Sequence, residues 1–383
     1  MPSLGRLNAA QAAHLLALLP LRQNTSLRGR FAATLSAAAE GRPQSGSGSR
    51  LGSTPATQDP QSVWLVNPAA LLQRLQTEMA RDRSGLVEQL KQLAQPKVLR
   101  VPDSAHWAQL LELYQRMPHL AAVLDPLLNR IKLQIATQHP LKLSPTLLTG
   151  APGNGKSHLL HQLAEVFNVP TLELQLGGNA DNLALVGTSR HWGSASPGKL
   201  ALFLAQSPVA NPLILLEEID KSGIGQHGWT LDIVLLLLEP ENACEFEDKF
   251  VEVPIDLSHC SFLATANSSA QLPAPLLSRF QTCLVSAPPP EAWSIILNNL
   301  YAHLLLQEGR AQLFHSTLPQ ELQAEFLAQC PSIRELRKRL EQGFDAALAC
   351  FDSPEALLRQ KGELLPEAPE TQASETQKRM GFF

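Results

Sequence analysis

From residue 141 onward, short apolar runs alternate with stretches of helical periodicity. The run Pro212 to Leu216 is apolar without interruption, which is typical of a central strand buried on both faces. Strands separated by helices are typical of a mostly parallel sheet covered by helices. Residues 141–287 are therefore predicted to form one α/β domain, with strands at 146–149, 171–176, 212–217, 261–266 and 282–285.

The segments that flank this domain carry no strand pattern of this kind. Residues 1–40 are rich in Ala and Leu and predict a small helical segment, whereas residues 41–62 are rich in Gly, Ser, Pro and Thr and predict a flexible linker. Apolar residues at helical spacing predict a helical region over 63–140, which includes a helix that starts at Asn67-Pro68. A second helical region follows at 288–351, and the polar tail 352–383 is expected to be mobile.

Composition narrows the classes of function. The chain has 383 residues, a formal net charge of −4 and 5% aromatic residues. It therefore lacks the overall basic field and the abundant stacking side chains that would favour nucleic acid as a partner. No apolar run approaches the ~18 residues that a membrane span needs. Five scattered cysteines without a C-x-x-C pair favour free thiols over disulfides or zinc, and we expect a cytoplasmic protein without membrane contact.

Residues 150–157 carry the strongest chemical signal. They read Gly150-Ala151-Pro152-Gly153-Asn154-Gly155-Lys156-Ser157, the pattern G-x-x-x-x-G-K-S, between a predicted strand and a predicted helix. Glycines let the backbone N–H groups curl toward one concavity at a helix N-terminus, which suits phosphate. In such a loop, Lys156 reaches the β and γ phosphates and Ser157 binds Mg²⁺. The alternative, a Gly-rich surface turn with a chance lysine, fits the flanking strand and helix poorly.

Polar side chains also follow two other predicted strands. Glu217 and Glu218 end one apolar run, and Asn267 ends another. Because ligands bind at the carboxyl ends of strands in open α/β sheets, these groups are predicted to meet the Gly-rich loop. Glu217 is then a ligand for Mg²⁺, Glu218 the general base for water, and Asn267 a contact for that water or for the γ-phosphate. The alternatives are a solvated strand end for the two acids and a plain turn for Asn267.

Three further features stay open on position alone. Arg279 comes after the strand that ends at Asn267, and Arg334 lies in the second helical region; each is either a site arginine or a member of a surface ion pair. The segment 176–198 is too Gly-rich and too long for a plain connection, which indicates a functional loop. Within it, Trp192 is either a functional aromatic or ordinary loop packing.

The chain resembles the ATPase module of Lon-type proteins, a branch of the AAA+ superfamily, from about Met117 to Cys350. The resemblance is carried by GAPGNGKS, LILLEEIDK, LLEPENACEFEDKFVEVPIDLSHCSFLATANS, LPAPLLSRF and SIRELRKRL. It implies a P-loop α/β domain followed by a helical lid (288–351), and a ring, usually hexameric, with ATP at subunit interfaces. It further implies that Arg279 is an arginine finger for the neighbour's γ-phosphate, that Arg334 is the lid arginine, and that Trp192-Gly193 is a pore loop.

Two departures from the family pattern qualify this resemblance. The metal-binding acid is usually Asp, and the longer side chain of Glu217 would alter the demanding geometry of Mg²⁺. Only 49 residues follow Arg334, too few for a Lon-type Ser/Lys peptidase domain, and the family's long N-terminal substrate-binding region is not recognisable. We therefore expect an ATPase without its own peptidase.

Three hypotheses about function follow. The first is a ring-forming ATPase that unfolds, threads or dismantles a protein client. The second is an ATP-binding switch or scaffold that hydrolyses weakly, for which the substitution at Glu217 is the reason. The third is a motor stimulated by nucleic acid, which the acidic balance disfavours.

Overall fold

The computed structural model describes residues 61–79, 84–177, 182–189, 195–222, 224–225, 228–328, 330–351, 353, 357 and 362–368. The predicted N-terminal segment 1–40, nearly all of the predicted linker and most of the tail lie outside these residues. The chain divides into two compact units, residues 1–61 and residues 62–383, and the second unit holds every element described below.

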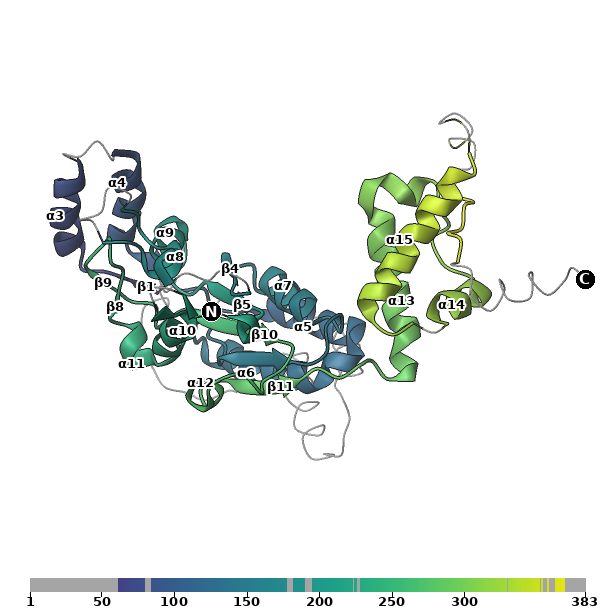
Figure 1. Ribbon diagram of the computed structural model, residues 1–383, viewed down its shortest axis with the longest axis horizontal. Helices are drawn as coiled ribbons and strands as arrows, with labels where there is room; N and C mark the ends of the chain where they lie inside the picture. Colours follow the sequence, from purple (N-terminus) through teal and green to yellow (C-terminus); the bar gives the residue numbers. More distant parts are fainter. Residues whose placement is uncertain are drawn as a thin grey trace, which may run out of the picture. The chain divides into compact units, whose positions relative to one another are not determined.

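The second unit is built around a five-stranded sheet in the order β11-β3-β10-β5-β4 (Figure 1). The strands are β3 (Thr146–Thr149), β4 (Thr171–Gln175), β5 (Leu213–Glu217), β10 (Ser261–Ala266) and β11 (Gln281–Leu284). Every neighbouring pair is parallel. Strands β3, β5 and β10 are buried along their whole length, as expected for central strands of a parallel sheet. The predicted α/β fold with a mostly parallel sheet is confirmed.

The strand order brings the predicted site residues together at the carboxyl ends of the strands. Strand β3 runs into helix α7 (Lys156–Phe167), whose chain continues to β4 at the far edge, while β11 lies on the other side of β3. Such a reversal of strand order leaves a crevice at the carboxyl ends of the strands. Helix α7 contacts β5 and β10 and so covers the sheet next to this crevice.

The connection from β5 to β10 is long and structured. It contains the 3₁₀ turn η3 (Ile219–Lys221), the short hairpin β6–β7 (Ile224–Gly225 and Gly228–Trp229), α10 (Thr230–Leu238) and α11 (Pro240–Ala243). The alternating apolar and polar residues of 246–257 form a second short hairpin after α11. Strands β8 (Phe246–Glu247) and β9 (Pro254–Ile255) pair antiparallel over two residues each.

The helical region before the sheet has two parts. In the first part, strands β1 (Ser62–Val63) and β2 (Lys97–Val98) pair with each other, and helices α3 (Pro68–Met79) and α4 (Ser84–Lys91) lie between these strands in the sequence. Apolar side chains of this part, such as Leu71 and Leu90, belong to the same buried cluster as the sheet residues Ile214 and Phe262. Asn67 caps α3 as predicted, since its Oδ1 accepts the Ala70 N–H at 3.2 Å. Helices α5 (Ser104–Arg116) and α6 (Ala121–Thr137) pack on each other, and α5 also contacts α7.

The predicted lid is helical and has its own apolar core. It consists of α13 (Trp293–Leu306), α14 (Gln320–Leu327) and α15 (Ile333–Ala349). Phe344 stacks on Tyr301 with ring centroids 5.5 Å apart and meets Phe314 edge-on at 4.7 Å. The Asn299 amide donates to the Arg116 carbonyl oxygen at 3.0 Å and so joins α13 to α5. Short helices elsewhere are α8 (Asn182–Val186), α9 (Lys199–Gln206) and α12 (Ala274–Leu277).

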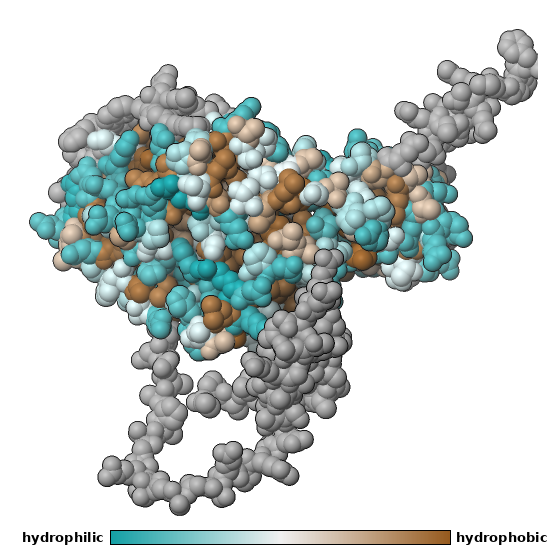
Figure 2. Space-filling view, turned by 90° about the horizontal axis from the view of Figure 1, so that it is seen from below, coloured by the Kyte–Doolittle hydropathy of each residue, from teal (hydrophilic) through white to brown (hydrophobic). Residues whose placement is uncertain are grey.

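The surface mixes apolar and polar side chains. On the face drawn in Figure 2, brown apolar residues lie in small groups among teal hydrophilic ones. Exposed apolar residues spread in this way are normal for a folded protein. Within the described part of the chain, no helix is both long enough and apolar enough to cross a membrane.

Candidate active site

The Gly-rich loop forms the turn that the sequence predicts. Gly150, Gly153 and Gly155 have φ values of 144°, 86° and 89°. A side chain at Gly150 would place its Cβ 2.2 Å from the Val285 carbonyl oxygen, so only glycine fits there. Gly155 is the N-cap residue of α7 and brings no capping side chain. The N–H groups of the first turn of α7 are therefore available to an anion such as phosphate.

Lys156 lies folded over this loop. Its exposed fraction is 8%, and its Nζ donates to the carbonyl oxygens of Gly150 at 2.7 Å and Ala151 at 3.0 Å, and to Asn267 Oδ1 at 3.3 Å. Burial lowers the pKa of Lys156, and the negative charges of Asp220 and Glu217 oppose that shift. The ammonium group is thus held by neutral oxygen acceptors that a charged phosphate could replace.

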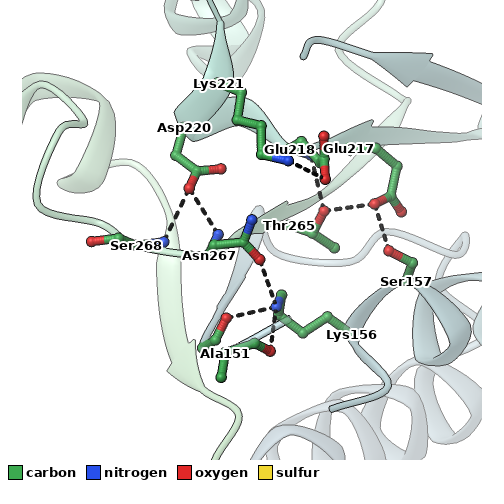
Figure 3. A network of polar contacts seen from close by, with 11 residues as sticks. Ala151, Lys156, Ser157, Glu217, Glu218, Asp220, Lys221, Thr265, Asn267 and Ser268 are labelled. Atoms are coloured by element: carbon green, nitrogen blue, oxygen red, sulfur yellow. Dashed lines mark hydrogen bonds and ion pairs between the residues drawn. The ribbon is translucent and has the colours of Figure 1, made fainter. Parts of the chain in front are cut away.

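Ser157 and Glu217 meet at the base of the loop (Figure 3). Glu217 Oε2 accepts the Ser157 hydroxyl at 2.6 Å and the Thr265 hydroxyl at 2.7 Å. Only 3% of Glu217 is exposed, and among the described residues its other oxygen, Oε1, is buried without a hydrogen-bond partner. A buried carboxylate oxygen that lacks a partner is costly unless a ligand completes it.

These groups fit a magnesium ion. One carboxylate, one hydroxyl and phosphate oxygens form the usual environment of Mg²⁺ in nucleotide sites. Glu217 Oε1 and the Ser157 hydroxyl would hold the ion, which would neutralise charge on the phosphates. The described residues contain no group of three or more His, Cys, Asp or Glu side chains that could hold a metal by themselves. With one carboxylate and one hydroxyl from the protein, the donor set suits an ion that also binds the phosphates of a nucleotide.

Glu218 directly follows Glu217, and Asn267 directly follows strand β10. The backbone of Glu218 is left-handed, with φ 54°, and its N–H donates to the Thr265 hydroxyl oxygen at 3.1 Å. The carboxylate of Glu218 accepts from Lys221 Nζ at 2.7 Å. Asn267 follows β10 and accepts from Lys156. The structure therefore brings the loop, both acids and Asn267 together at one edge of the sheet.

Arg279 is engaged within its own chain. It follows α12, and its Nε donates to Glu239 Oε1 at 2.7 Å, while a second nitrogen of the same guanidinium also contacts that oxygen. Within the described residues, the Arg279 side chain hydrogen-bonds to Glu239, Pro275 and Ser278 and not to the loop or the two acids, which is compatible with the predicted role toward a neighbouring subunit.

Arg334 lies near the loop. A Cβ built on Gly153 would be 3.2 Å from Arg334 Cβ and 3.2 Å from the Ser332 side chain. The charge of Arg334 also contributes to lowering the pKa of Lys156. The lid thus faces the phosphate loop through the first turn of α15. The predicted pore-loop residues Trp192 and Gly193 lie outside the described residues.

Comparison with known proteins identifies the domain that holds this site. Residues 146–286 match the ATPase family associated with various cellular activities (AAA). These residues form an AAA domain. It begins at β3 and ends just after β11, so that it includes the whole sheet and the phosphate loop. Together with the relatives below, the AAA domain supports an ATP-binding protein of the AAA+ class.

The relatives carry the names of Lon proteases. The chain is 39% identical over 163 residues to the Lon protease of Lachnoclostridium phytofermentans, which covers 42% of this chain and 20% of that protein. It is 32% identical over 221 residues to the peroxisomal Lon protease homolog 2 of Oryza sativa subsp. indica, covering 57% of this chain and 25% of that protein. It is 31% identical over 220 residues to the Lon protease of Methanosarcina barkeri, with coverage of 57% and 26%. The chain thus spans about a fifth to a quarter of the length of these relatives. The cytoplasmic location expected from the sequence stays a prediction.

Two residues of the AAA domain were missed by the sequence reasoning. Thr265 is buried and joins Glu217 to the Glu218 backbone. Asp220 accepts hydrogen bonds from the backbone next to Asn267. A hydroxyl within the apolar run Phe262 to Ala266 is a signal that could have pointed to Thr265. Asp220 lies two positions after Glu218 in the sequence, but its direction depends on the turn that Glu218 begins.

Proposed function

We propose that this protein binds and hydrolyses ATP and uses the energy to remodel a protein client. The observation that carries the proposal is the convergence of polar groups from three strand ends in two neighbouring hydrogen-bonded sets. One set joins Lys156 to Asn267, and the other joins Ser157, Glu217, Thr265 and Glu218. Phosphoryl transfer needs positioning and charge neutralisation, which this set of groups supplies.

Each residue has a defined task in the proposed reaction. The N–H groups of the loop and Lys156 Nζ bind the β and γ phosphates, and Ser157 and Glu217 hold Mg²⁺. Glu218 leaves Lys221, orients the attacking water and accepts its proton, so that ADP and phosphate form. Asn267 and Arg334 contact the γ-phosphate from the sheet and from the lid. No peptidase activity is part of the proposal.

The proposal includes a homo-oligomeric ring, with six subunits as the expected number. Arg279 would act on the γ-phosphate of the neighbouring subunit, after it has left Glu239. Trp192 and Gly193 would grip the polypeptide client. The ring and the client rest on the AAA domain and on the similarity to relatives named as Lon proteases.

Phosphate release by the purified full chain tests the enzymatic part. We expect turnover that needs Mg²⁺ and that falls by at least about 10²-fold in Glu218→Gln.

Sedimentation of this slow variant with and without ATP tests whether a ring forms. Phosphate release by Arg279→Ala tests the contribution of the neighbouring subunit. Trp192→Ala is expected to lose client processing while it retains hydrolysis. A monomer that is fully active would contradict the shared site.

A second candidate, an ATP-binding switch with weak hydrolysis, is favoured by one specific observation. Both the proposed base and the proposed finger are paired within the chain, Glu218 with Lys221 and Arg279 with Glu239. If these pairs persist with ATP bound, binding would change the conformation without rapid turnover. Turnover of the wild-type protein that Glu218→Gln abolishes would reject the switch.

A further inference from the structure

Asp220 connects the two strands that carry the proposed base and Asn267. Its Oδ2 accepts the backbone N–H groups of Asn267 at 2.9 Å and Ser268 at 3.1 Å (Figure 3). Both N–H groups lie just beyond the end of β10, whereas Asp220 lies just beyond the end of β5. One carboxylate oxygen therefore fixes the direction in which the chain leaves β10.

The turn that carries Asp220 is itself held firmly. Glu218 begins it with a left-handed backbone, and the Lys221 N–H donates to the Glu218 carbonyl oxygen at 2.9 Å. Ile219, which lies between Glu218 and Asp220, is completely buried in the core. This tight turn directs Asp220 back toward β10 rather than outward. Asp220 is thus placed by the backbone and by core packing, independently of any ligand.

The fixed backbone of Asn267 determines where its side chain lies. Asn267 Oδ1 accepts from Lys156 Nζ at 3.3 Å, so the contact between the sheet and the phosphate loop depends on the position of Asn267. Asp220 therefore acts on the site through the two hydrogen bonds that fix the backbone of Asn267 and Ser268.

We infer that Asp220 is a positioning residue for ATP hydrolysis, which holds Asn267 so that its amide meets Lys156 and the γ-phosphate. This inference rests on the proposed function. The inference assigns a functional role to Asp220, whose hydrogen bonds would otherwise only stabilise the turn at Ser268. Because small displacements of a positioned group cost up to about 10²-fold in rate, its removal should be visible in kcat.

Two substitutions separate the hydrogen bonds from the charge. Asp220→Ala removes both, and we expect kcat to fall by about 10- to 100-fold while KM for ATP stays within about 3-fold. Asp220→Asn keeps an oxygen acceptor for both N–H groups, and kcat should stay within about 3-fold of the wild type. An equal loss in Asp220→Asn would overturn the role of the hydrogen bonds.

A double-mutant cycle shows whether Asp220 acts through Asn267. If it does, Asp220→Ala costs little further in an Asn267→Ala background, because the group that it positions is already absent. The matched control is Asp256→Ala, since Asp256 Oδ1 accepts the Ser258 N–H at 2.8 Å near the other end of β10. The control should leave kcat unchanged. Full additivity between Asp220→Ala and Asn267→Ala would overturn the inference.

Hydrogen exchange tests the inference without any turnover. In nucleotide-free protein, the amides of Asn267 and Ser268 should exchange faster in Asp220→Ala and at the wild-type rate in Asp220→Asn. Unchanged exchange in folded Asp220→Ala would reject the positioning role even if ATP is hydrolysed. Normal behaviour in this assay with no turnover in the wild type would instead reject the proposed function. If Asp220→Ala does not fold, Asp220→Ser takes its place in each measurement.

Discussion

Glu239 accepts two hydrogen bonds from the guanidinium of Arg279, which lies forty positions further along the chain. The remaining terminal nitrogen of Arg279 donates to the Pro275 carbonyl oxygen at 3.1 Å and to the Ser278 hydroxyl at 2.9 Å. Four of the five N–H donors of this arginine are therefore satisfied within its own chain. To reach a neighbour's phosphate, Arg279 has to exchange Glu239 for the phosphate.

The first prediction is that Glu239→Gln raises turnover at saturating ATP. The neutral amide holds Arg279 less strongly, and because an exposed ion pair contributes about 0.2–1 kcal/mol, turnover should rise by about 1.4- to 5-fold. Phosphate release per subunit measures the effect, with Glu241→Gln on the neighbouring helix as the control. The increase should vanish in an Arg279→Ala background. An increase that persists there would show that Glu239 acts by another route.

The second prediction concerns Thr265, whose hydroxyl lies between the two acids. Thr265→Val keeps the shape of the side chain but removes the donor to Glu217 and the acceptor for the Glu218 N–H. Loss of a buried hydrogen bond to a charged group costs about 1.5–3 kcal/mol, so the Mg²⁺ concentration for half-maximal turnover should rise by about 10-fold or more. Titration of Mg²⁺ at saturating ATP measures this, and Thr265→Ser should behave as the wild type. If valine and serine give the same curve, the hydroxyl has no part in metal binding.

Much of the fold and part of the site could be predicted because their signals are local. The run Leu213 to Leu216 has no polar residue to face water, and its short length between turn signals favours a buried strand. The loop from Gly150 to Ser157 contains its own backbone requirements within eight residues. Such features need no knowledge of what lies across the fold.

The remainder depends on residues that are distant in sequence. The pair of Arg279 and Glu239 requires α12 and the start of α11 to meet, which no periodicity indicates. Similarly, the apolar faces of α3 and α4 predict burial but not their partner, and the structure places them in the core of the α/β domain. Asp220 could be read as one more acid at a strand end, and only the left-handed turn at Glu218 directs it to Asn267.

The third prediction is a loss of stability in mild acid that arises from His119. Burial lowers the pKa of His119 below its usual 6.5, and the adjacent Asn154 backbone opposes the shift. Burial lowers the pKa of His158 in the same way. Since the unfolded chain then binds more protons than the folded one, this contribution to stability is complete above about pH 6.5 and is lost as the pH falls toward the folded pKa values.

Urea unfolding between pH 5 and 8 measures the effect. His119→Gln should reduce the slope of the unfolding free energy against pH by less than one bound proton, and addition of His158→Gln should reduce it further. A slope that stays the same in the double variant would show that other groups cause the acid sensitivity.

The fourth prediction concerns the approach of the lid to the phosphate loop. In Gly153→Ala the added Cβ would lie 3.2 Å from Ser332 and Arg334, at a residue with φ 86°. A left-handed backbone costs a residue other than glycine roughly 1–2 kcal/mol, and the close contact pushes the loop away from α15. Because both changes disturb the site where ATP would bind, we expect affinity for ATP to fall by about 10-fold or more. The midpoint of thermal unfolding should fall as well.

The matched control is Gly85→Ala in α4, where an added Cβ meets nothing within 4 Å. In that variant, ATP binding should be unchanged and the stability equal or slightly higher. Calorimetric titration with ATP compares the two variants, and wild-type affinity in Gly153→Ala would mean that the lid does not close on this loop when the nucleotide binds.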